Sequence, residues 1–204
     1  MNIRPFIGTV ICMVMLTWSS YGQSHASNIV FLLDISNSMG KDHKMELLQK
    51  STEELCKVLN TKDRVSLLTF GTVVETLYSS SSFSGSDSLL QMLKRVRSTA
   101  AATNINRGIY DAFEQSDKLK LLDENHVFLV TDGEFALNPF TKSLVEKRKD
   151  IRLTCVIVGK GPSAEKAVKY VTEELKLKVI TLVNEEADVK KLAELVRSTV
   201  IDFQ

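Results

Sequence analysis

The chain has 204 residues, of which 44% are hydrophobic and 25% are charged. This length and composition fit one globular domain with a substantial core. The formal net charge is +1, from 26 Lys and Arg against 25 Asp and Glu. Such a balance lacks the basic excess that is typical of proteins that bind nucleic acid or anionic membranes.

The first 26 residues differ in composition from the rest of the chain. Arg4 is followed by an apolar run over 5–18 and then by small and polar residues up to Ala26. A run of roughly 14 apolar residues is shorter than the ~20 that span a bilayer, whereas it fits the core of a secretory signal peptide. We therefore expect a signal peptide over 1–22, with an alternative end at 26, and one domain over 23–204. The mature chain would be secreted, extracellular or periplasmic, with no net charge.

The first part of the mature chain predicts a strand, a helix and a hairpin. Residues 29–33 are apolar throughout, which indicates a buried strand, and 41–59 carries apolar side chains near helical spacing. Residues 64–70 and 73–78 are rich in Val, Leu and Thr, and the Gly-Thr dipeptide between them favours a turn.

The remaining sequence continues this alternation. The serine-dominated stretch 79–88 predicts a loop. Apolar runs and helical repeats then follow one another, and Pro139 can open a helix. We expect helices over 89–96, 105–119, from 139 to the charged run 146–150, over 163–175 and over 188–201, and strands over 126–131, 151–158 and 178–182.

These elements predict an α/β fold. Strands that are apolar from end to end are buried on both faces, which is typical of parallel sheets covered by helices. We expect a doubly wound, Rossmann-like and mostly parallel sheet of six strands, with helices on both faces and one antiparallel edge strand from the hairpin. In such sheets, ligands bind beyond the carboxyl ends of the strands.

Oxygen-bearing side chains follow these expected carboxyl ends. Asp34, Ser36 and Ser38 come directly after the first strand, Thr103 lies in a loop before a helix, and Asp132 follows the strand 126–131. Carboxylate and hydroxyl oxygens without His or Cys suit Mg²⁺, with Mn²⁺ or Ca²⁺ as alternatives. The first three residues alone are also compatible with helix capping by a serine.

Together, these motifs resemble the von Willebrand factor type A (VWA) domain family. The resemblance rests on Asp-x-Ser-x-Ser, the Thr before a helix and the Thr-Asp-Gly that ends a strand, and it covers essentially the whole mature chain. It implies a metal-ion-dependent adhesion site (MIDAS) made of Asp34, Ser36, Ser38, Thr103 and Asp132. The serines and the threonine would bind the metal directly, and the aspartates directly or through water.

The resemblance also implies a function. A VWA domain would be a binding module, not an enzyme, and a partner protein would complete the metal shell with an Asp or Glu. We expect a monomer that binds neither nucleic acid nor, after signal cleavage, the membrane interior. Met39 and Gly40, at the expected helix start, would add backbone N–H groups that favour an anion.

The chain departs from the family pattern at two points. Asn37 stands where Gly is frequent, and Ala100, Ala101 and Ala102 replace a Gly-rich lead into the threonine loop. Asn tolerates a left-handed backbone better than most residues, so the first change is mild. The alanines are expected to stiffen the loop. Because the site would face solvent, we also expect variants of its aspartates to fold.

Two other functions compete with binding. A metal-dependent hydrolase is disfavoured, because Ser36 stands where a second carboxylate would, and the sequence has neither a Gly-x-x-x-x-Gly-Lys loop nor a Gly-x-Ser-x-Gly elbow. A structural domain that uses no metal is the other alternative. His43 and His126 have no metal-ligand spacing, which favours non-catalytic roles.

Two cysteines remain in the mature chain, Cys56 in a helical pattern and Cys155 in a strand pattern. Export would permit a disulfide between them. Two separate buried thiols are the alternative that their patterns favour.

Overall fold

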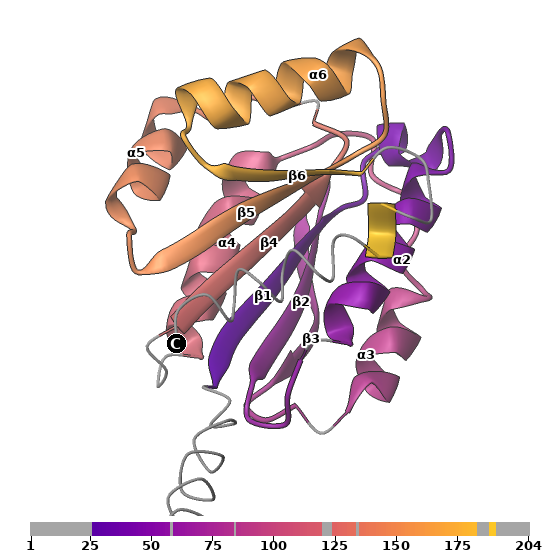
Figure 1. The fold of residues 1–204 in the computed structure, drawn as a ribbon, viewed down its shortest axis with the longest axis vertical. Helices are drawn as coiled ribbons and strands as arrows, with labels where there is room; N and C mark the ends of the chain where they lie inside the picture. Colours follow the sequence, from indigo (N-terminus) through magenta and orange to yellow (C-terminus); the bar gives the residue numbers. More distant parts are fainter. Residues whose placement is uncertain are drawn as a thin grey trace, which may run out of the picture.

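The computed structural model describes residues 26–57, 59–83, 85–119, 124–133, 135–182 and 188–190. Within these ranges, no helix is long and apolar enough to cross a membrane. The expected signal peptide over 1–22, and all but the first residues of the helix expected over 188–201, lie outside them. In this described part of the chain, six strands form one sheet in the order β3-β2-β1-β4-β5-β6 (Figure 1). They are β1 (Ser27–Asp34), β2 (Arg64–Phe70), β3 (Val74–Ser80), β4 (Glu124–Thr131), β5 (Ile151–Val158) and β6 (Lys178–Leu182).

The sheet has the predicted doubly wound topology. The central strand β1 pairs in parallel with β2 on one side and β4 on the other, and β5 and β6 continue the parallel arrangement. β3 pairs antiparallel with β2 at the edge. The prediction of a mostly parallel sheet with one antiparallel edge strand from the hairpin is confirmed.

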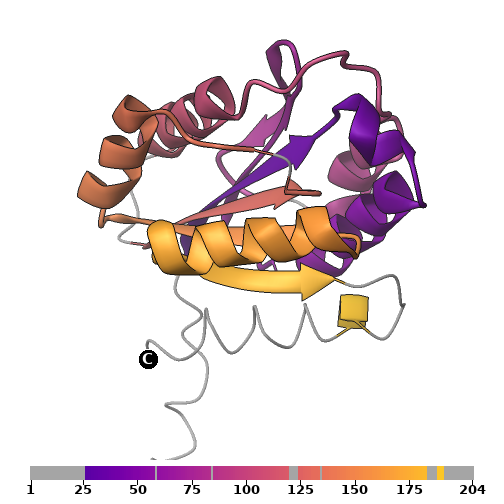
Figure 2. The same ribbon diagram turned by 90° about the horizontal axis from the view of Figure 1, so that it is seen from above.

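Helices cover both faces of the sheet (Figure 2). α2 (Lys44–Cys56) and α3 (Ser86–Leu93) lie on one face, and α4 (Ile105–Lys118), α5 (Pro139–Lys147) and α6 (Pro162–Lys169) lie on the other. A 3₁₀ helix, η2 (Asn37–Gly40), follows β1, and a π turn, η3 (Tyr170–Glu174), follows α6.

The core consists of two apolar clusters that the sheet separates. All eight residues of β1 are buried, and its alternate side chains point to opposite faces. Phe31 therefore belongs to the cluster beneath α2 and α3, and Leu32 to the cluster beneath α4 to α6. Cys56 and Cys155 lie in different clusters and both are free thiols. The buried-thiol interpretation is therefore confirmed.

Several predicted boundaries were wrong. The helix expected from residue 41 begins at Lys44, because 37–40 form the 3₁₀ helix and Asp42 and His43 adopt left-handed backbone angles, with φ of 53° and 58°. The stretch 79–88 is not one loop, since β3 extends to Ser80 and α3 begins at Ser86. Its serines still find partners: the hydroxyl of Ser66 and the amide of Gln115 donate to Ser79 Oγ.

A glycine sets the distance between α4 and the sheet. A Cβ on Gly108 would lie 3.1 Å from Cγ and 3.2 Å from Cβ of Phe70, closer than ordinary van der Waals contact. The helix begins after Asn104, whose side chain caps it by accepting a hydrogen bond from the Arg107 N–H. Gly108 thus holds the start of α4, and the loop before it, against the end of β2.

Candidate metal site

Asp34 lies at the carboxyl end of the central strand and is only 1% exposed. Its Oδ1 accepts a hydrogen bond of 2.8 Å from the Ser36 N–H, and its Oδ2 accepts one of 2.7 Å from the Thr131 hydroxyl. Burial raises the pKa of this carboxyl group, and the hydrogen bonds from Ser36 and Thr131 oppose that effect. Asp34 therefore fixes the segments after β1 and at the end of β4 to each other.

The two serines that follow Asp34 converge on one point. Ser36 Oγ and Ser38 Oγ are 3.0 Å apart. Ser36 is the residue before η2, but its side chain makes no capping hydrogen bond, and neither does that of His43 before α2. The helix-capping interpretation of this motif is therefore wrong for Ser36, whose hydroxyl faces that of Ser38.

The loop that carries Thr103 is fastened to the end of β1 by its backbone. The Asn37 N–H donates to the Ala100 carbonyl at 2.9 Å, and the Ala100 N–H donates to the Ile35 carbonyl at 3.1 Å. The Asn104 N–H donates to the Gly71 carbonyl at 2.8 Å. Thr103 is half-buried between these attachments.

Ala100, one of the alanines before Thr103, packs closely against Gly71. A Cβ on Gly71 would lie only 2.1 Å from the Cβ of Ala100. The methyl group of Ala100 therefore occupies space that any other residue at position 71 would fill. The loss of glycine in the threonine loop is thus compensated by a glycine in the hairpin turn that faces it.

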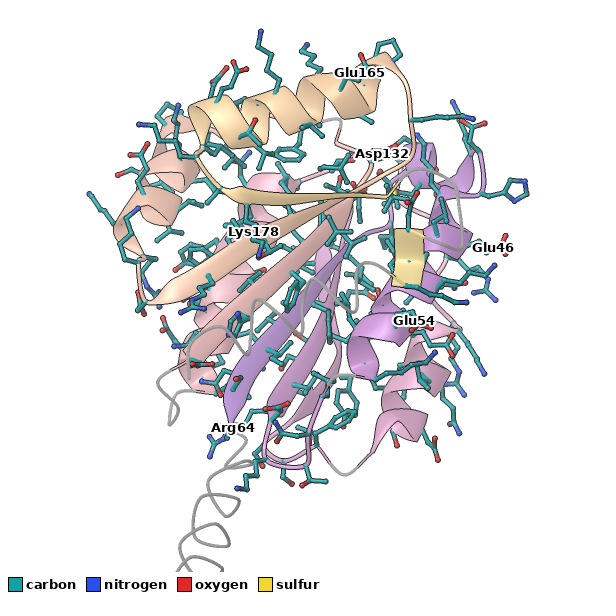
Figure 3. All side chains as sticks on the ribbon, in the orientation of Figure 1. Glu46, Glu54, Arg64, Asp132, Glu165 and Lys178 are labelled. Atoms are coloured by element: carbon teal, nitrogen blue, oxygen red, sulfur yellow. The ribbon has the colours of Figure 1, made fainter. Side chains whose placement is uncertain are left out.

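Asp132 lies at the end of β4, beside the start of α2 (Figure 3), and is 2% exposed. Its Oδ2 accepts a hydrogen bond of 2.9 Å from the ammonium group of Lys44, which forms an ion pair with it. We did not anticipate Lys44 from the sequence, because 88 residues separate it from Asp132 and no motif contains it.

Two expectations about this site were wrong. Asp34 and Asp132 are buried and do not face solvent. The Met39 N–H is not available to an anion, because it donates to the Ser36 carbonyl at 3.0 Å within η2. The positive end of a helix therefore does not lie at Met39 and Gly40, since α2 starts only at Lys44.

A hollow of about 680 Å³ adjoins the site. The first two turns of α2 and the loop before it line one side, and Gly159 and Lys160 line the other. Lys44 lines this hollow as well as contacting Asp132, so one side chain joins the two.

The donor set fits a hard divalent cation. Neighbouring oxygens in an octahedral Mg²⁺ shell, with metal–oxygen distances of about 2.0–2.1 Å, lie about 2.8–3.0 Å apart. A hydrogen bond between the Ser36 and Ser38 hydroxyl groups holds their oxygens 3.0 Å apart, at the upper end of this range. Among the described residues, no group of three or more His, Cys, Asp and Glu side chains could hold a metal. A metal at this edge would therefore need the hydroxyl groups as ligands.

The chain is similar to several known proteins. It is 30% identical over 145 residues to the uncharacterized protein YfbK of Escherichia coli, an alignment that covers 68% of this chain and 25% of that protein. Its fold is similar to that of a von Willebrand factor type A structure from Catenulispora acidiphila, with a TM-score of 0.70, 14% identity and coverage of 86% of this chain and 43% of that one. It also resembles proximal thread matrix protein 1 from the mussel byssus with a zinc-occupied MIDAS motif, with a TM-score of 0.62, 18% identity and coverage of 85% and 46%.

A family model decides the assignment. The model of the von Willebrand factor type A domain matches residues 28–196, which is most of the chain. The strand order and the helices on both faces agree with this match. The chain therefore belongs to the von Willebrand factor type A domain family.

Proposed function

We propose that this VWA domain is a non-catalytic binding module that captures a protein partner through a divalent cation. Asp34, Ser36, Ser38, Thr103 and Asp132 would hold the ion. The observation that carries the proposal is the 3.0 Å separation of the Ser36 and Ser38 hydroxyl oxygens, directly after the anchored carboxylate of Asp34. The zinc-occupied MIDAS of the mussel protein supports a metal role for this kind of domain.

The charges of the site suit recognition of an anion. Two carboxylates are the only formal charges among the five residues, because serine and threonine are neutral. When bound, the ion would supply an electrophilic position that an Asp or Glu of the partner completes. Mg²⁺ fits the all-oxygen donor set, and Mn²⁺ or Ca²⁺ are alternatives.

Asp34 would act mainly as an anchor. Both of its oxygens already accept one hydrogen bond, from the Ser36 N–H and the Thr131 hydroxyl. Each oxygen keeps a second lone pair with which to accept from a metal-bound water or to bind the metal. The same carboxylate holds the backbone of Ser36, so it positions a hydroxyl ligand as well.

The histidines support a function other than hydrolysis. His126 lies in the first half of β4, away from the end of the strand that carries Asp132. The His43 side chain is 87% exposed and pairs with Glu46. Neither therefore has the place of a general base beside Asp34, and the proposal includes no enzymatic activity.

The proposal includes export and a monomeric state. A signal peptide over 1–22 would direct the chain to the periplasm or the cell exterior, where a partner with an exposed Asp or Glu would meet the site. The balanced charge of the chain supports a protein partner over nucleic acid or an anionic membrane surface.

Metal titration tests the site directly. Calorimetry with Mg²⁺ and Mn²⁺ on the purified protein should show one site, and Ser36→Ala and Asp34→Asn should each weaken binding at least tenfold. Asp87→Ala is the control, because Asp87 is an exposed carboxylate on α3 that belongs neither to the five residues nor to the lining of the hollow. Equal metal affinity in all four proteins would contradict the proposal.

Partner capture tests the function. The protein is used as bait in the native extracellular or periplasmic fraction, with Mg²⁺ or with EDTA, and Ser36→Ala serves as the second bait. Partners should be lost with EDTA and with the variant. Capture that survives both would indicate a structural domain that uses no metal, and turnover of phosphate esters that Asp34→Asn abolishes would indicate a hydrolase.

A further inference from the structure

The ion pair between Lys44 and Asp132 places a positive charge inside the candidate metal site. Lys44 Nζ is 2.9 Å from Asp132 Oδ2, and the two side chains are 15% and 2% exposed. A shielded pair of this kind is screened by salt far less than a surface pair. We propose that Lys44 is an internal cation that competes with the divalent ion for Asp132, so that metal binding requires Lys44 to leave. This inference rests on the proposed function, because it concerns the same five residues.

The backbone directs Lys44 into the site. It is the first residue of α2, and the two residues before it, Asp42 and His43, both have left-handed angles, with φ of 53° and 58°. Consecutive non-glycine residues in this region are uncommon, and such strain concentrates at functional positions. His43 is the residue before α2, and its side chain makes no capping hydrogen bond that would account for the strain.

The opposite wall of the site is shaped for the lysine stem. The positive φ of Gly159, 104°, favours glycine, and a Cβ at this position would lie 3.2 Å from Cε and 3.7 Å from Cδ of Lys44. The stem therefore runs across a glycine at the end of β5 before the ammonium group reaches Asp132. This close fit, together with the low exposure of Lys44, indicates a built contact and not a chance encounter of surface groups.

The adjoining hollow gives the displaced side chain a destination. It measures about 680 Å³, and Lys44 already lines it. Asp42 also lines it and offers its carboxylate to a released ammonium group, whereas Glu46 is already paired with Lys50. The lysine can therefore exchange one carboxylate for another by turning about its flexible stem, without movement of α2.

The sign of the effect separates competition from assistance. A positive charge beside the site repels a divalent cation and occupies one of its two carboxylates. If Lys44 instead positioned Asp132 for the metal, its removal would weaken metal binding. Competition predicts the reverse, namely tighter binding when the charge is removed.

Calorimetric titration with Mn²⁺ tests this sign. Lys44→Met and Lys44→Gln should each bind Mn²⁺ at least tenfold more tightly than the unchanged protein. Lys57→Met is the control, because Lys57 lies at the far end of the same helix, outside the hollow, and pairs with Glu54. It removes the same charge without touching Asp132, and its affinity should change less than twofold. Equal or weaker binding by both Lys44 variants would overturn the inference.

Thermal unfolding gives a second, independent measurement. In EDTA, Lys44→Met should unfold at a lower temperature than the unchanged protein, because Asp132 loses its buried partner. Saturating Mn²⁺ should raise the unfolding temperature of this variant more than that of the unchanged protein. An equal shift in both would also count against competition.

The two proposals fail in different ways. If the unchanged protein binds Mn²⁺ and Ser36→Ala does not, while the Lys44 variants bind no more tightly, only the role of Lys44 is refuted. If neither the unchanged protein nor any Lys44 variant binds Mn²⁺, both proposals are refuted.

Discussion

The contact between Gly71 and Ala100 allows a quantitative test of how the hairpin turn supports the threonine loop. In Gly71→Ala, the new methyl carbon would start 2.1 Å from the Cβ of Ala100. Carbon atoms in ordinary contact are about 3.5–4.0 Å apart, so the two backbones would have to separate by about 1.5 Å. Hydrogen bonds hold both segments, from the Asn37 N–H to the Ala100 carbonyl and from the Asn104 N–H to the Gly71 carbonyl.

This clash should be costly, and a second substitution should relieve it. Overpacking of this kind costs ~1–3 kcal/mol, and we expect the upper end because the Cβ of Ala100 cannot move without its backbone. For a domain of this size, a loss of ~3 kcal/mol lowers the unfolding temperature by about 6–12 °C. Ala100→Gly alone should cost about 0.5–1 kcal/mol through greater freedom of the unfolded chain. The double variant should be about as stable as Ala100→Gly, so the coupling equals the cost of Gly71→Ala alone, ~3 kcal/mol.

Urea denaturation of the four proteins, each in EDTA, measures this coupling without any contribution from metal. Mn²⁺ titration of the same proteins then tells whether the loop position matters to the site. Binding should weaken in Gly71→Ala and recover in the double variant. Additive losses of stability, with a coupling below about 0.5 kcal/mol, would refute the contact as described.

Three further predictions concern the core and the surface. Burial, and then the charge of Arg152, lower the pKa of His126 in the folded protein. As pH falls below about 6.5, the unfolded chain therefore binds this proton first, and the free energy of unfolding falls by at most ~1.4 kcal/mol per pH unit. Urea denaturation of His126→Gln between pH 7 and 5 should lack this part of the pH dependence. Burial raises the pKa of Cys56 and Cys155 to about 12, so iodoacetamide at pH 8 should modify neither thiol in the folded protein and both in urea, as mass spectrometry would show; rapid labelling of the folded protein would contradict this. Arg148→Ala should lower the free energy of unfolding by ~1–2 kcal/mol, because the guanidinium group of Arg148 binds two aspartates and lies over the ring of Phe113. An unchanged midpoint of urea denaturation would contradict this.

Strands and sheet topology were predictable because burial on both faces leaves a direct mark on the sequence. The strands 64–70, 151–158 and 178–182 have the bounds that their composition predicts. Parallel strands covered by helices must be apolar throughout, so few other sequences satisfy the constraint. The hairpin was equally visible, from its turn residues.

The start of the first helix could not be predicted from the same signals. Helical periodicity begins near residue 41, but Asp42 and His43 are left-handed and the helix starts at Lys44. Asp and His adopt left-handed angles more often than most residues other than glycine, but neither requires them, so the sequence does not mark these positions. The serine-rich stretch failed for a related reason, because Ser79 finds partners in Ser66 and Gln115 that no local pattern reveals.

Some residues of the candidate site could likewise be predicted from the sequence, and one could not. Asp34, Ser36, Ser38, Thr103 and Asp132 could be selected because each follows a recognisable strand or precedes a helix. The structure brings Asp34, Ser36 and Ser38 together and fastens the loop of Thr103 to them. The partner of Asp132 could not be selected, since Lys44 reaches it only through the packing of α2 against the end of the sheet. A charged residue in a first helical turn has no feature that separates it from a solvated one.

Gly108 has a consequence for anyone who wishes to stabilise this domain by engineering. Replacement of helix glycines by alanine is a standard route to higher stability, worth about 1 kcal/mol where the helix surface is open. At this position the added methyl group would press on Phe70 and lift the start of α4 away from the sheet. Thr103 lies directly before Asn104, the cap of that helix, so a design that ranks substitutions by helix propensity alone would select a change that moves a candidate metal ligand outward.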